Sequence, residues 1–166
     1  VITERQIDEL GRFDAIYLGA IGHPKVTPGI LEKELLLAIR FQLDQYINLR
    51  PIKLYPGVDT PLKDKGPEDI SFEVVRENTE DLYAVGSQGV NVTGDLGVDF
   101  RVITSQGSER IIDAAFAHAQ RTGKETVTVV TKANIVKTTD GKFLDMARKV
   151  AERYPGIKWE GWYIDL

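Results

Sequence analysis

The sequence predicts an α/β fold. Segments of strand length, rich in β-branched and aromatic residues, alternate with segments whose apolar residues recur at helical spacing, and short loops connect them. The 166 residues are 42% hydrophobic and 28% charged, which is the profile of a globular protein with about one domain's worth of chain. The sequence contains neither an internal repeat nor a low-complexity tract.

The first part of the chain predicts a strand, a helix and a second strand. Residues 13–19 form an apolar run that glycines close, which is typical of a buried strand. The Thr-Pro pair at 27–28 suits the N-cap and first position of a helix that continues to about Tyr46 with a wide apolar stripe. We expect Pro51 to end the next segment and residues 52–55 to form the second strand.

The middle of the chain predicts more loop than regular structure. Residues 56–67 are rich in proline and glycine and predict a loop. Residues 71–76 predict a strand. Residues 83–97 combine Gly, Ser, Asn and Thr with scattered valines, which indicates a loop or a loose hairpin. Alternation over residues 99–104 predicts a further strand.

The last third carries the clearest periodicity. A helix is expected to start at Ser105 or Ser108 and to end at Gly123, which suits a C-cap. Its predicted inward residues are Ile111, Ile112, Ala115, Phe116 and Ala119. A strand, a helix and a strand are expected to follow, over 126–131, 140–153 and 157–164.

Composition argues against several classes of function. The chain has no cysteine, which excludes disulfides, thiolate metal sites and a cysteine nucleophile. It has no apolar run long enough to span a membrane. The net charge of −4 argues against nucleic-acid binding. We therefore expect a cytoplasmic protein that binds neither nucleic acid nor membrane. Because the chain begins at Val1 and ends within a predicted strand, we also expect it to be a piece of a longer protein.

Four cationic residues are the candidates for a binding site. Arg40 lies within a predicted helix, Arg50 follows one segment later, Arg76 ends a predicted strand, and Lys132 ends another. Ligands of open α/β sheets bind at the carboxyl ends of strands, where Arg76 and Lys132 are expected. Because arginine binds carboxylates bidentately, three convergent arginines would suit a substrate with two carboxylates. Alternatively, each residue is a solvated charge or half of a structural ion pair.

Four sequence blocks contain these residues, and a fifth lies near the end of the chain. They are Leu36-Leu37-Ala38-Ile39-Arg40, Asn48-Leu49-Arg50-Pro51 with Tyr55-Pro56-Gly57, Val75-Arg76-Glu77-Asn78-Thr79-Glu80-Asp81-Leu82-Tyr83, Lys132-Ala133-Asn134, and Tyr163-Ile164-Asp165. In order and spacing, over essentially the whole chain, they resemble the β-decarboxylating dehydrogenases. This family comprises isopropylmalate, isocitrate, homoisocitrate, and tartrate or D-malate dehydrogenases.

The resemblance implies a role for each matched residue. The substrate carboxylates would be bound by Arg40, Arg50 and Arg76. Tyr83 would protonate the enol after decarboxylation. Three residues follow the last two strands: Lys132 would take the proton of the substrate hydroxyl, Asn134 would lie near substrate and nicotinamide, and Asp165 would be the first metal-site aspartate. In the family, the lysine and this aspartate act in the active site of the partner subunit.

The resemblance also implies the reaction and the architecture. The reaction is oxidative decarboxylation of a 2-hydroxy dicarboxylate, with NAD or NADP as cofactor and Mg²⁺ or Mn²⁺ as metal, in a homodimer with shared active sites. The fold is an isopropylmalate dehydrogenase-like three-layer α/β/α fold, incomplete here. Residues 1–45 would be the end of the first α/β domain, and residues 46–166 the central substrate-binding and dimerisation domain, truncated at its C-terminus. Residues 83 to about 100 would form an arm across the dimer interface.

Substrate choice depends on residues before the first arginine. Isocitrate enzymes place serine and asparagine where this chain has Glu34 and Leu36. The apolar pair Leu36 and Leu37 favours a substrate with an alkyl group, hence isopropylmalate and a place in leucine biosynthesis. The block from Arg76 to Glu80 also suits tartrate or D-malate enzymes, or isocitrate enzymes. Residues 134–137 and 139–141 resemble the isocitrate and homoisocitrate enzymes.

Departures from the family pattern leave other functions open. Asp81 stands where many members have glycine. Two further metal-site aspartates and the adenine-binding segment of the family have no counterpart in these residues, so we expect the chain to be inactive alone. A non-catalytic regulatory subunit of the same family, or a free-standing interaction module, would be the alternative.

Overall fold

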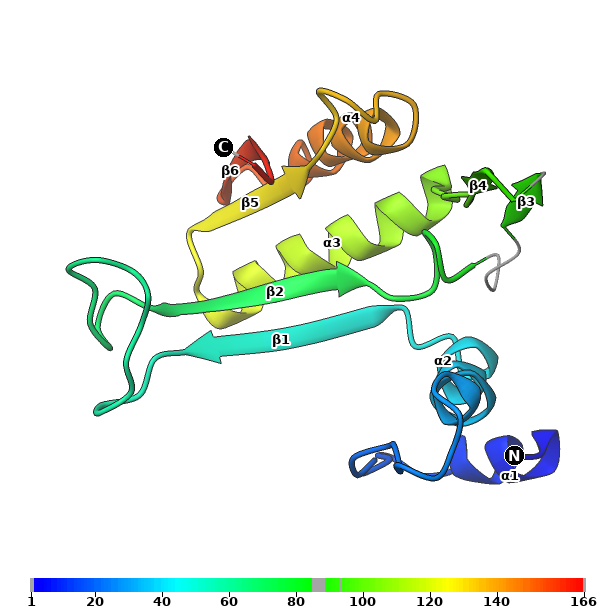
Figure 1. Ribbon diagram of the computed structural model, residues 1–166. Helices are drawn as coiled ribbons and strands as arrows, with labels where there is room; N and C mark the ends of the chain where they lie inside the picture. Colours follow the sequence, from blue (N-terminus) through cyan, green and yellow to red (C-terminus); the bar gives the residue numbers. More distant parts are fainter. Residues whose placement is uncertain (1, 85–88, 93, 166) are drawn as a thin grey trace. The chain divides into compact units, whose positions relative to one another are not determined.

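A computed structural model describes residues 2–84, 89–92 and 94–165 (Figure 1). The chain divides into two compact units, Val1–Tyr46 and Ile47–Leu166. Within the described residues, no helix is both long and apolar enough to cross a membrane.

The first unit consists of helices and irregular segments. Helix α1 spans Glu4–Leu10 and begins at Thr3, whose side chain and that of Gln6 form a capping box. Ile7 of this helix is buried, at 1% exposure. A π-helical segment, η1, spans Glu32–Leu37 and continues directly into α2, Ala38–Gln42.

The strand predicted over residues 13–19 is absent, and that prediction is wrong. The segment is irregular, and Phe13 and Tyr17 are 64% and 100% exposed. An apolar run forms a strand only when its backbone groups find a neighbouring strand to pair with. The described part of this unit contains no strand, so the backbone of residues 13–19 has no neighbouring strand with which to form hydrogen bonds.

The predicted helix up to Tyr46 is shorter than expected. Gly29 has φ of 90°, which excludes it from a right-handed helix, and the Glu32 carboxylate accepts a hydrogen bond from its N–H. At the other end, α2 stops at Gln42, and Asp44 adopts φ of 44° as the chain turns. The predicted apolar stripe includes the π-helical segment, in which no side chain is fully buried.

The second unit begins with an antiparallel pair of strands. Strand β1 spans Ile47–Lys53 and β2 spans Ser71–Glu77, with Asn48 opposite Arg76. Strand β2 matches the prediction, but β1 starts earlier than residue 52, and Pro51 lies inside it rather than ending a segment. The proline is tolerated because β1 pairs on one side only in this two-stranded sheet.

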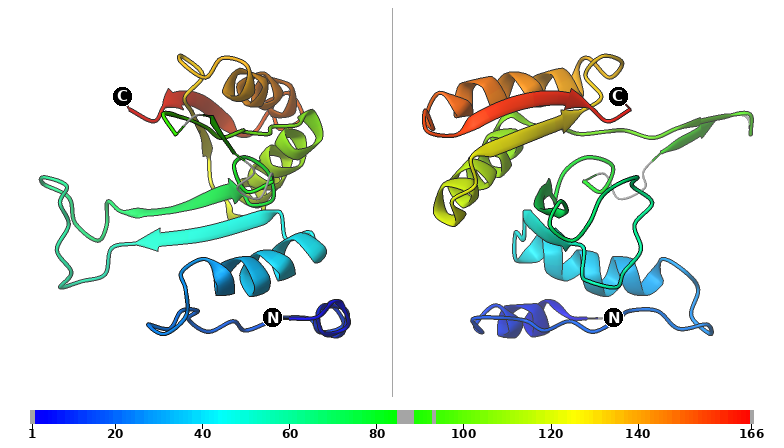
Figure 2. Two further views of the ribbon diagram at one scale, coloured as in Figure 1. Left: turned by 45° about the vertical axis from the view of Figure 1, so that its right-hand side comes forward. Right: turned by 90° about the vertical axis from the view of Figure 1, so that its left-hand side faces the viewer.

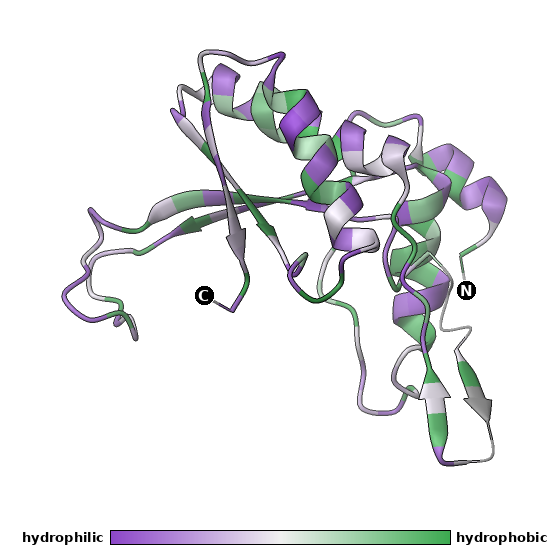
Figure 3. Cartoon of the chain, turned by 90° about the horizontal axis from the view of Figure 1, so that it is seen from above, coloured by the Kyte–Doolittle hydropathy of each residue, from purple (hydrophilic) through white to green (hydrophobic). Residues whose placement is uncertain are grey.

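A small hairpin follows the loop that leaves β2. Strands β3, Val90–Val92, and β4, Leu96–Val98, pair antiparallel, which agrees with the predicted loose hairpin. In Figures 2 and 3 the hairpin extends away from the helices of this unit. Residues 85–88 and 93 of the predicted segment lie outside the described residues. The strand predicted over 99–104 is wrong, because only an isolated bridge between Asp81 and Val102 forms there.

The remaining elements agree with the predictions. Helix α3 spans Ser105–Thr122 and ends at Gly123, which adopts the left-handed conformation expected of a C-cap. Strand β5, Thr126–Thr131, helix α4, Thr139–Ala151, and strand β6, Lys158–Tyr163, follow. Strands β5 and β6 are parallel neighbours, so the three elements form a βαβ unit.

The core of the second unit lies where α3 and α4 pack on β5. Both helices carry apolar and polar residues in alternation along the ribbon (Figure 3). Phe116 is fully buried and stacks on Tyr154 with ring centroids 5.3 Å apart. The other buried apolar residues of these three elements are Ile111, Ile112, Ala119, Val129, Ala147, Val150 and Ala151.

Together these elements form an incomplete α/β fold, as the sequence predicts. The described residues contain three separate two-stranded sheets rather than one continuous sheet. The parallel β5–α4–β6 unit is the part that shows the α/β pattern directly.

Candidate active site

Strands β5 and β6 end side by side and bring Lys132 and Asp165 together. The parallel register pairs Thr131 with Tyr163, and the N–H of Ile164 donates to the Thr131 carbonyl at 3.0 Å. The Lys132 ammonium, directly after β5, forms an ion pair with the Asp165 carboxylate. Two of the residues singled out in the sequence are therefore in direct contact.

The electrostatics of this pair favour an ionised carboxylate. The hydrogen bond from Lys132 holds the pKa of the Asp165 carboxyl below its ordinary value. An ionised, 54% exposed carboxylate is the kind of hard oxygen ligand that Mg²⁺ and Mn²⁺ prefer. Asp165 is therefore suited to be one ligand of such a metal ion. Over residues 2–84, 89–92 and 94–165, however, no three His, Asp or Glu residues lie close enough to hold a metal ion together.

The turn after Lys132 is fixed at several backbone points. The Lys132 carbonyl accepts hydrogen bonds from the N–H groups of Ile135 and Val136, at 3.0 and 2.8 Å. The N–H of Lys132 donates to Oδ2 of Asp140 at 2.6 Å. Asn134 lies exposed within this turn, two residues from the lysine. The β5–α4 connection therefore holds Lys132 and Asn134 on one short, ordered segment.

Arg50 and Arg76 are linked through two asparagines. Asn48 and Arg76 are opposite each other in the β1–β2 ladder, and Arg50 lies two residues from Asn48 on the same face. Oδ1 of Asn78 accepts from Arg76 NH2 at 3.1 Å and from Asn48 Nδ2 at 3.2 Å. Oδ1 of Asn48 in turn accepts from Nε of Arg50 at 2.9 Å. A continuous chain of hydrogen bonds thus orients both guanidinium groups.

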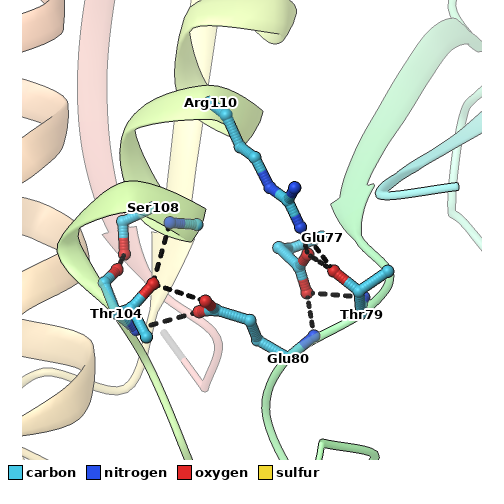
Figure 4. A network of polar contacts seen from close by, with 7 residues as sticks. Glu77, Thr79, Glu80, Thr104, Ser108 and Arg110 are labelled. Carbon is cyan, nitrogen blue, oxygen red and sulfur yellow. Dashed lines mark hydrogen bonds and ion pairs between the residues drawn. The ribbon is translucent and has the colours of Figure 1, made fainter. Parts of the chain in front are cut away.

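The segment from Glu77 to Tyr83 is shaped by a carboxylate that binds backbone groups. The Glu77 carboxylate accepts from the Thr79 N–H at 2.9 Å, the Thr79 hydroxyl at 2.7 Å and the Glu80 N–H at 2.6 Å (Figure 4). Arg110 of α3 donates to the Thr79 hydroxyl at 2.7 Å and pairs with Glu77 at 3.7 Å. This turn precedes Tyr83, which is 48% exposed.

Glu80 ties the same turn to the start of α3. Its carboxylate accepts hydrogen bonds from the N–H and the hydroxyl of Thr104, the N-cap of that helix (Figure 4). The Thr104 hydroxyl also accepts from the Gly107 N–H at 2.9 Å. A Cβ at Gly107 would overlap the Glu80 carboxylate, which would then have to move away from Thr104.

Arg101 connects the Tyr83 loop to the helix that follows Lys132. Its Nε and NH2 donate to the two oxygens of Asp81 at 2.6 and 3.0 Å, and its NH1 donates to Oδ1 of Asp140 at 2.8 Å. Hydrogen bonding to Asp81 raises the pKa of Arg101 above its ordinary value. Asp81 adopts φ of 67°, a conformation that aspartate tolerates.

The remaining predicted residues lie in the first unit. Leu36 and Leu37 end the π-helical segment, and Arg40 follows in α2, one turn from Leu36 on the same face. All three side chains are partly buried. A cavity of about 360 Å³ in this unit is lined by Ile2, Gln6, Ile30, Leu31, Glu34 and Leu35, none of which is a predicted site residue.

The structure thus brings together Arg50 with Arg76, and Lys132 with Asp165. It adds partners that the sequence interpretation did not include: Asn48, Asn78, Arg101 and Asp140. Asn48 and Asn78 lie within the family-like blocks, so they carried a usable signal. Arg101 and Asp140 carried none, because their partners are 20 and 39 residues apart in sequence.

Comparisons with known proteins agree on one family. The family model described as "Isocitrate/isopropylmalate dehydrogenase" matches residues 1–166. A 3-isopropylmalate dehydrogenase of Bifidobacterium longum subsp. infantis is 44% identical over 163 residues, 95% of this chain and 47% of that protein. The D-malate dehydrogenase [decarboxylating] of Escherichia coli is 40% identical over 162 residues, 96% of this chain and 45% of that protein.

Solved structures give the same result. The crystal structure of isocitrate dehydrogenase from Methylococcus capsulatus superposes with a TM-score of 0.72 at 36% identity, covering 85% of this chain and 41% of that one. The TT0538 protein from Thermus thermophilus gives a TM-score of 0.73 at 33% identity, covering 85% of this chain and 28% of that one.

The fold and these matches define the class of protein, which is that of the isocitrate and isopropylmalate dehydrogenases. The chain belongs to the isocitrate/isopropylmalate dehydrogenase family, and it spans about half the length of the curated relatives it matches.

Proposed function

We propose that this chain is part of an enzyme that oxidises and decarboxylates a 2-hydroxy dicarboxylate. The observation that carries the proposal is the contact of Lys132 with Asp165 at the ends of two parallel strands. Ligands of α/β folds bind at such strand ends, and a lysine beside a carboxylate supplies a proton acceptor and a metal ligand in one place. Family membership supports this chemistry.

The guanidinium groups would bind and orient the substrate. Arg50 and Arg76, linked through Asn48 and Asn78, can each grip a carboxylate, and we propose Arg40 as the third group. Leu36 and Leu37 would contact the group that distinguishes one substrate from another. The family resemblance of the sequence supports these roles.

Two side chains would move protons. The Lys132 ammonium must leave the Asp165 carboxylate and lose a proton to solvent before the resulting amine can take the proton of the substrate hydroxyl. Tyr83 would later return a proton to the carbon that has lost CO₂. When bound, NAD or NADP would accept the hydride, and Mg²⁺ or Mn²⁺ would stabilise the charge that develops on oxygen. In this chain, Asp165 would bind the metal, and Asn134 would face the nicotinamide.

We propose 3-isopropylmalate as the substrate. The apolar pair Leu36 and Leu37 favours an alkyl group, and several relatives named 3-isopropylmalate dehydrogenase are about 40% identical. The second candidate is D-malate, which the name of the Escherichia coli relative favours at similar identity. We further propose that residues 1–45 end a first domain and that residues 46–166 belong to a central domain that forms a homodimer.

The test uses the full-length protein that contains this chain. Isopropylmalate, D-malate, tartrate, isocitrate and homoisocitrate would each be supplied with NAD or NADP and Mg²⁺ or Mn²⁺. We expect cofactor reduction and CO₂ release with isopropylmalate, and loss of turnover by orders of magnitude in K132M with the fold intact. Absence of turnover with every substrate would favour a non-catalytic subunit. Unchanged turnover in K132M would remove Lys132 from the mechanism.

A further inference from the structure

A single guanidinium group holds two elements of the second unit together. Arg101 lies between the β3–β4 hairpin and α3, and it binds Asp81 with two nitrogens and Asp140 with the third. Asp81 belongs to the loop after β2, and Asp140 to the first turn of α4. The two carboxylates are bridged by Arg101 across 59 residues of sequence.

Each carboxylate controls a backbone segment next to a proposed site residue. Asp81 lies two residues before Tyr83, adopts a left-handed conformation, and pairs its backbone with Val102. The two carboxylate oxygens of Asp140 bind different groups. Oδ1 accepts a hydrogen bond from Arg101, and Oδ2 accepts one from the Lys132 N–H at 2.6 Å. The position of Asp140 is therefore transmitted to Lys132 through one hydrogen bond.

This bridge differs from the surface ion pairs of the chain. The Asp140 side chain is 11% exposed, and those of Arg101 and Asp81 are 33% and 40% exposed, whereas both partners of the Arg148–Asp145 pair are more than half exposed. Exposed ion pairs contribute little because water screens them. The Arg101 guanidinium binds Asp81 with two hydrogen bonds and the buried Asp140 with a third. Such a contact fixes the geometry of the three side chains more strongly than a single exposed ion pair does.

We propose that Arg101 is a positioning residue that sets where the Tyr83 loop lies relative to the Lys132 strand end. The inference rests on the proposed function for its catalytic consequence. Since the family resemblance assigns Lys132 to the partner's active site, one Arg101 would align groups that serve two active sites of a dimer. Arg101 itself is not proposed to touch the substrate.

The experiment compares R101M with a matched control in the full-length protein. Arg153 also pairs with two carboxylates, those of Glu109 and Asp113 at 3.0 and 3.3 Å, so R153M removes a similar bridge elsewhere. R101K keeps the charge but not the bidentate geometry. Two readouts are needed: amide hydrogen exchange at Asp81 and Lys132, and separate kcat and KM values.

We expect R101M to speed exchange at both amides and to lower kcat about 10–100-fold with little change in KM, because misplaced groups slow the chemistry rather than binding. R101K should recover part of both effects, and R153M should match the wild type. A rise in KM alone, or unchanged exchange at Lys132, would overturn the proposal.

A second variant covers the case in which R101M does not fold. D81N removes the charged partner while asparagine still tolerates the left-handed conformation. It should lower kcat and speed exchange at Asp81, and a wild-type kcat would overturn the proposal. If the wild type turned over no 2-hydroxy acid, the proposed function would fail, whereas the exchange measurements would still decide whether Arg101 couples the two segments.

Discussion

Asn78 is a buried amide with a defined orientation. It is 7% exposed, and its carbonyl oxygen accepts hydrogen bonds from both Arg76 and Asn48. Because Asn48 donates to Asn78 with its side-chain nitrogen, its side-chain oxygen faces Arg50 and accepts a hydrogen bond from it. One amide therefore orients two guanidinium groups that a dicarboxylate substrate would meet.

Replacing Asn78 by alanine should weaken substrate binding. N78A removes the shared acceptor, so both arginines lose orientation, and we expect KM for the dicarboxylate to rise about tenfold with a smaller change in kcat. Steady-state kinetics of the full-length protein measures this. Q120A, at an exposed position on α3, is the control for loss of an amide. An unchanged KM in N78A would show that the arginines need no such support.

The loop before Tyr83 is held in place by contacts with the first turn of helix α3. Thr104 caps the helix through the Gly107 N–H, and Glu80 binds Thr104 through two groups. The helix cap and the loop therefore meet beside Gly107. A side chain at this position would occupy the space that the Glu80 carboxylate fills.

Two glycine-to-alanine variants test this close contact. G107A should lose the hydrogen bonds between Glu80 and Thr104, because the Glu80 carboxylate must move away, whereas alanine raises the helix propensity; we expect a net destabilisation of about 0–1 kcal/mol. Gly141, inside α4, has open space at its Cβ position, so G141A should stabilise by about 0.5–1 kcal/mol through helix propensity. Urea unfolding of the full-length protein gives both values. Equal effects of the two variants would contradict the contact.

The turn that follows α4 contains Tyr154, whose hydroxyl contacts α3. Burial and the hydrogen bond that Tyr154 donates to Asp113 at 2.9 Å raise the pKa of Tyr154 above its usual 10.0. A raised pKa in the folded state gives a stabilisation that is fully present below pH 10 and is lost as pH rises through the folded pKa.

Y154F should therefore change the alkaline part of the stability profile. The variant keeps the stack on Phe116 but loses the hydrogen bond, which should cost about 0.5–1.5 kcal/mol at pH 7. Between about pH 10 and 11 its stability should fall less steeply than that of the wild type. Urea midpoints measured from pH 7 to 11 compare the two. Parallel profiles would mean that Tyr154 titrates alike in both states.

At the scale of the whole molecule, the sequence predicted what local periodicity determines. Helix α3 with its Gly123 cap, strand β5 and helix α4 followed from residue spacing. Residues 13–19 did not, because an apolar run becomes a strand only beside a partner. Pro51 was misread for a similar reason, since its tolerance depends on β1 being an edge.

The same distinction separates the parts of the candidate site. Arg76 and Lys132 could be placed because strand ends are visible in the sequence. The bridge made by Arg101 could not, because each of its contacts joins segments that the fold alone brings together. Positioning residues are thus harder to predict from one sequence than the residues they position.

The arrangement of active sites between subunits can be tested by mixing two inactive variants. If Lys132 serves the partner's site, Y83F and K132M homodimers both lack a complete site. A mixed dimer, however, has one site with both groups and one with neither. Co-expression in equal amounts makes half of the dimers mixed, so activity should return to about one quarter of the wild-type value.

The alternative arrangement gives a different result. If Tyr83 and Lys132 of one chain served the same site, every site in a mixed dimer would lack one of them, and activity would stay at the level of the single variants. Tagging the two chains differently and purifying the mixed dimer should raise the recovered activity to about one half, because every molecule then carries one complete site. A mixed dimer as inactive as its parents would contradict both the shared site and the assignment of Lys132 to the partner.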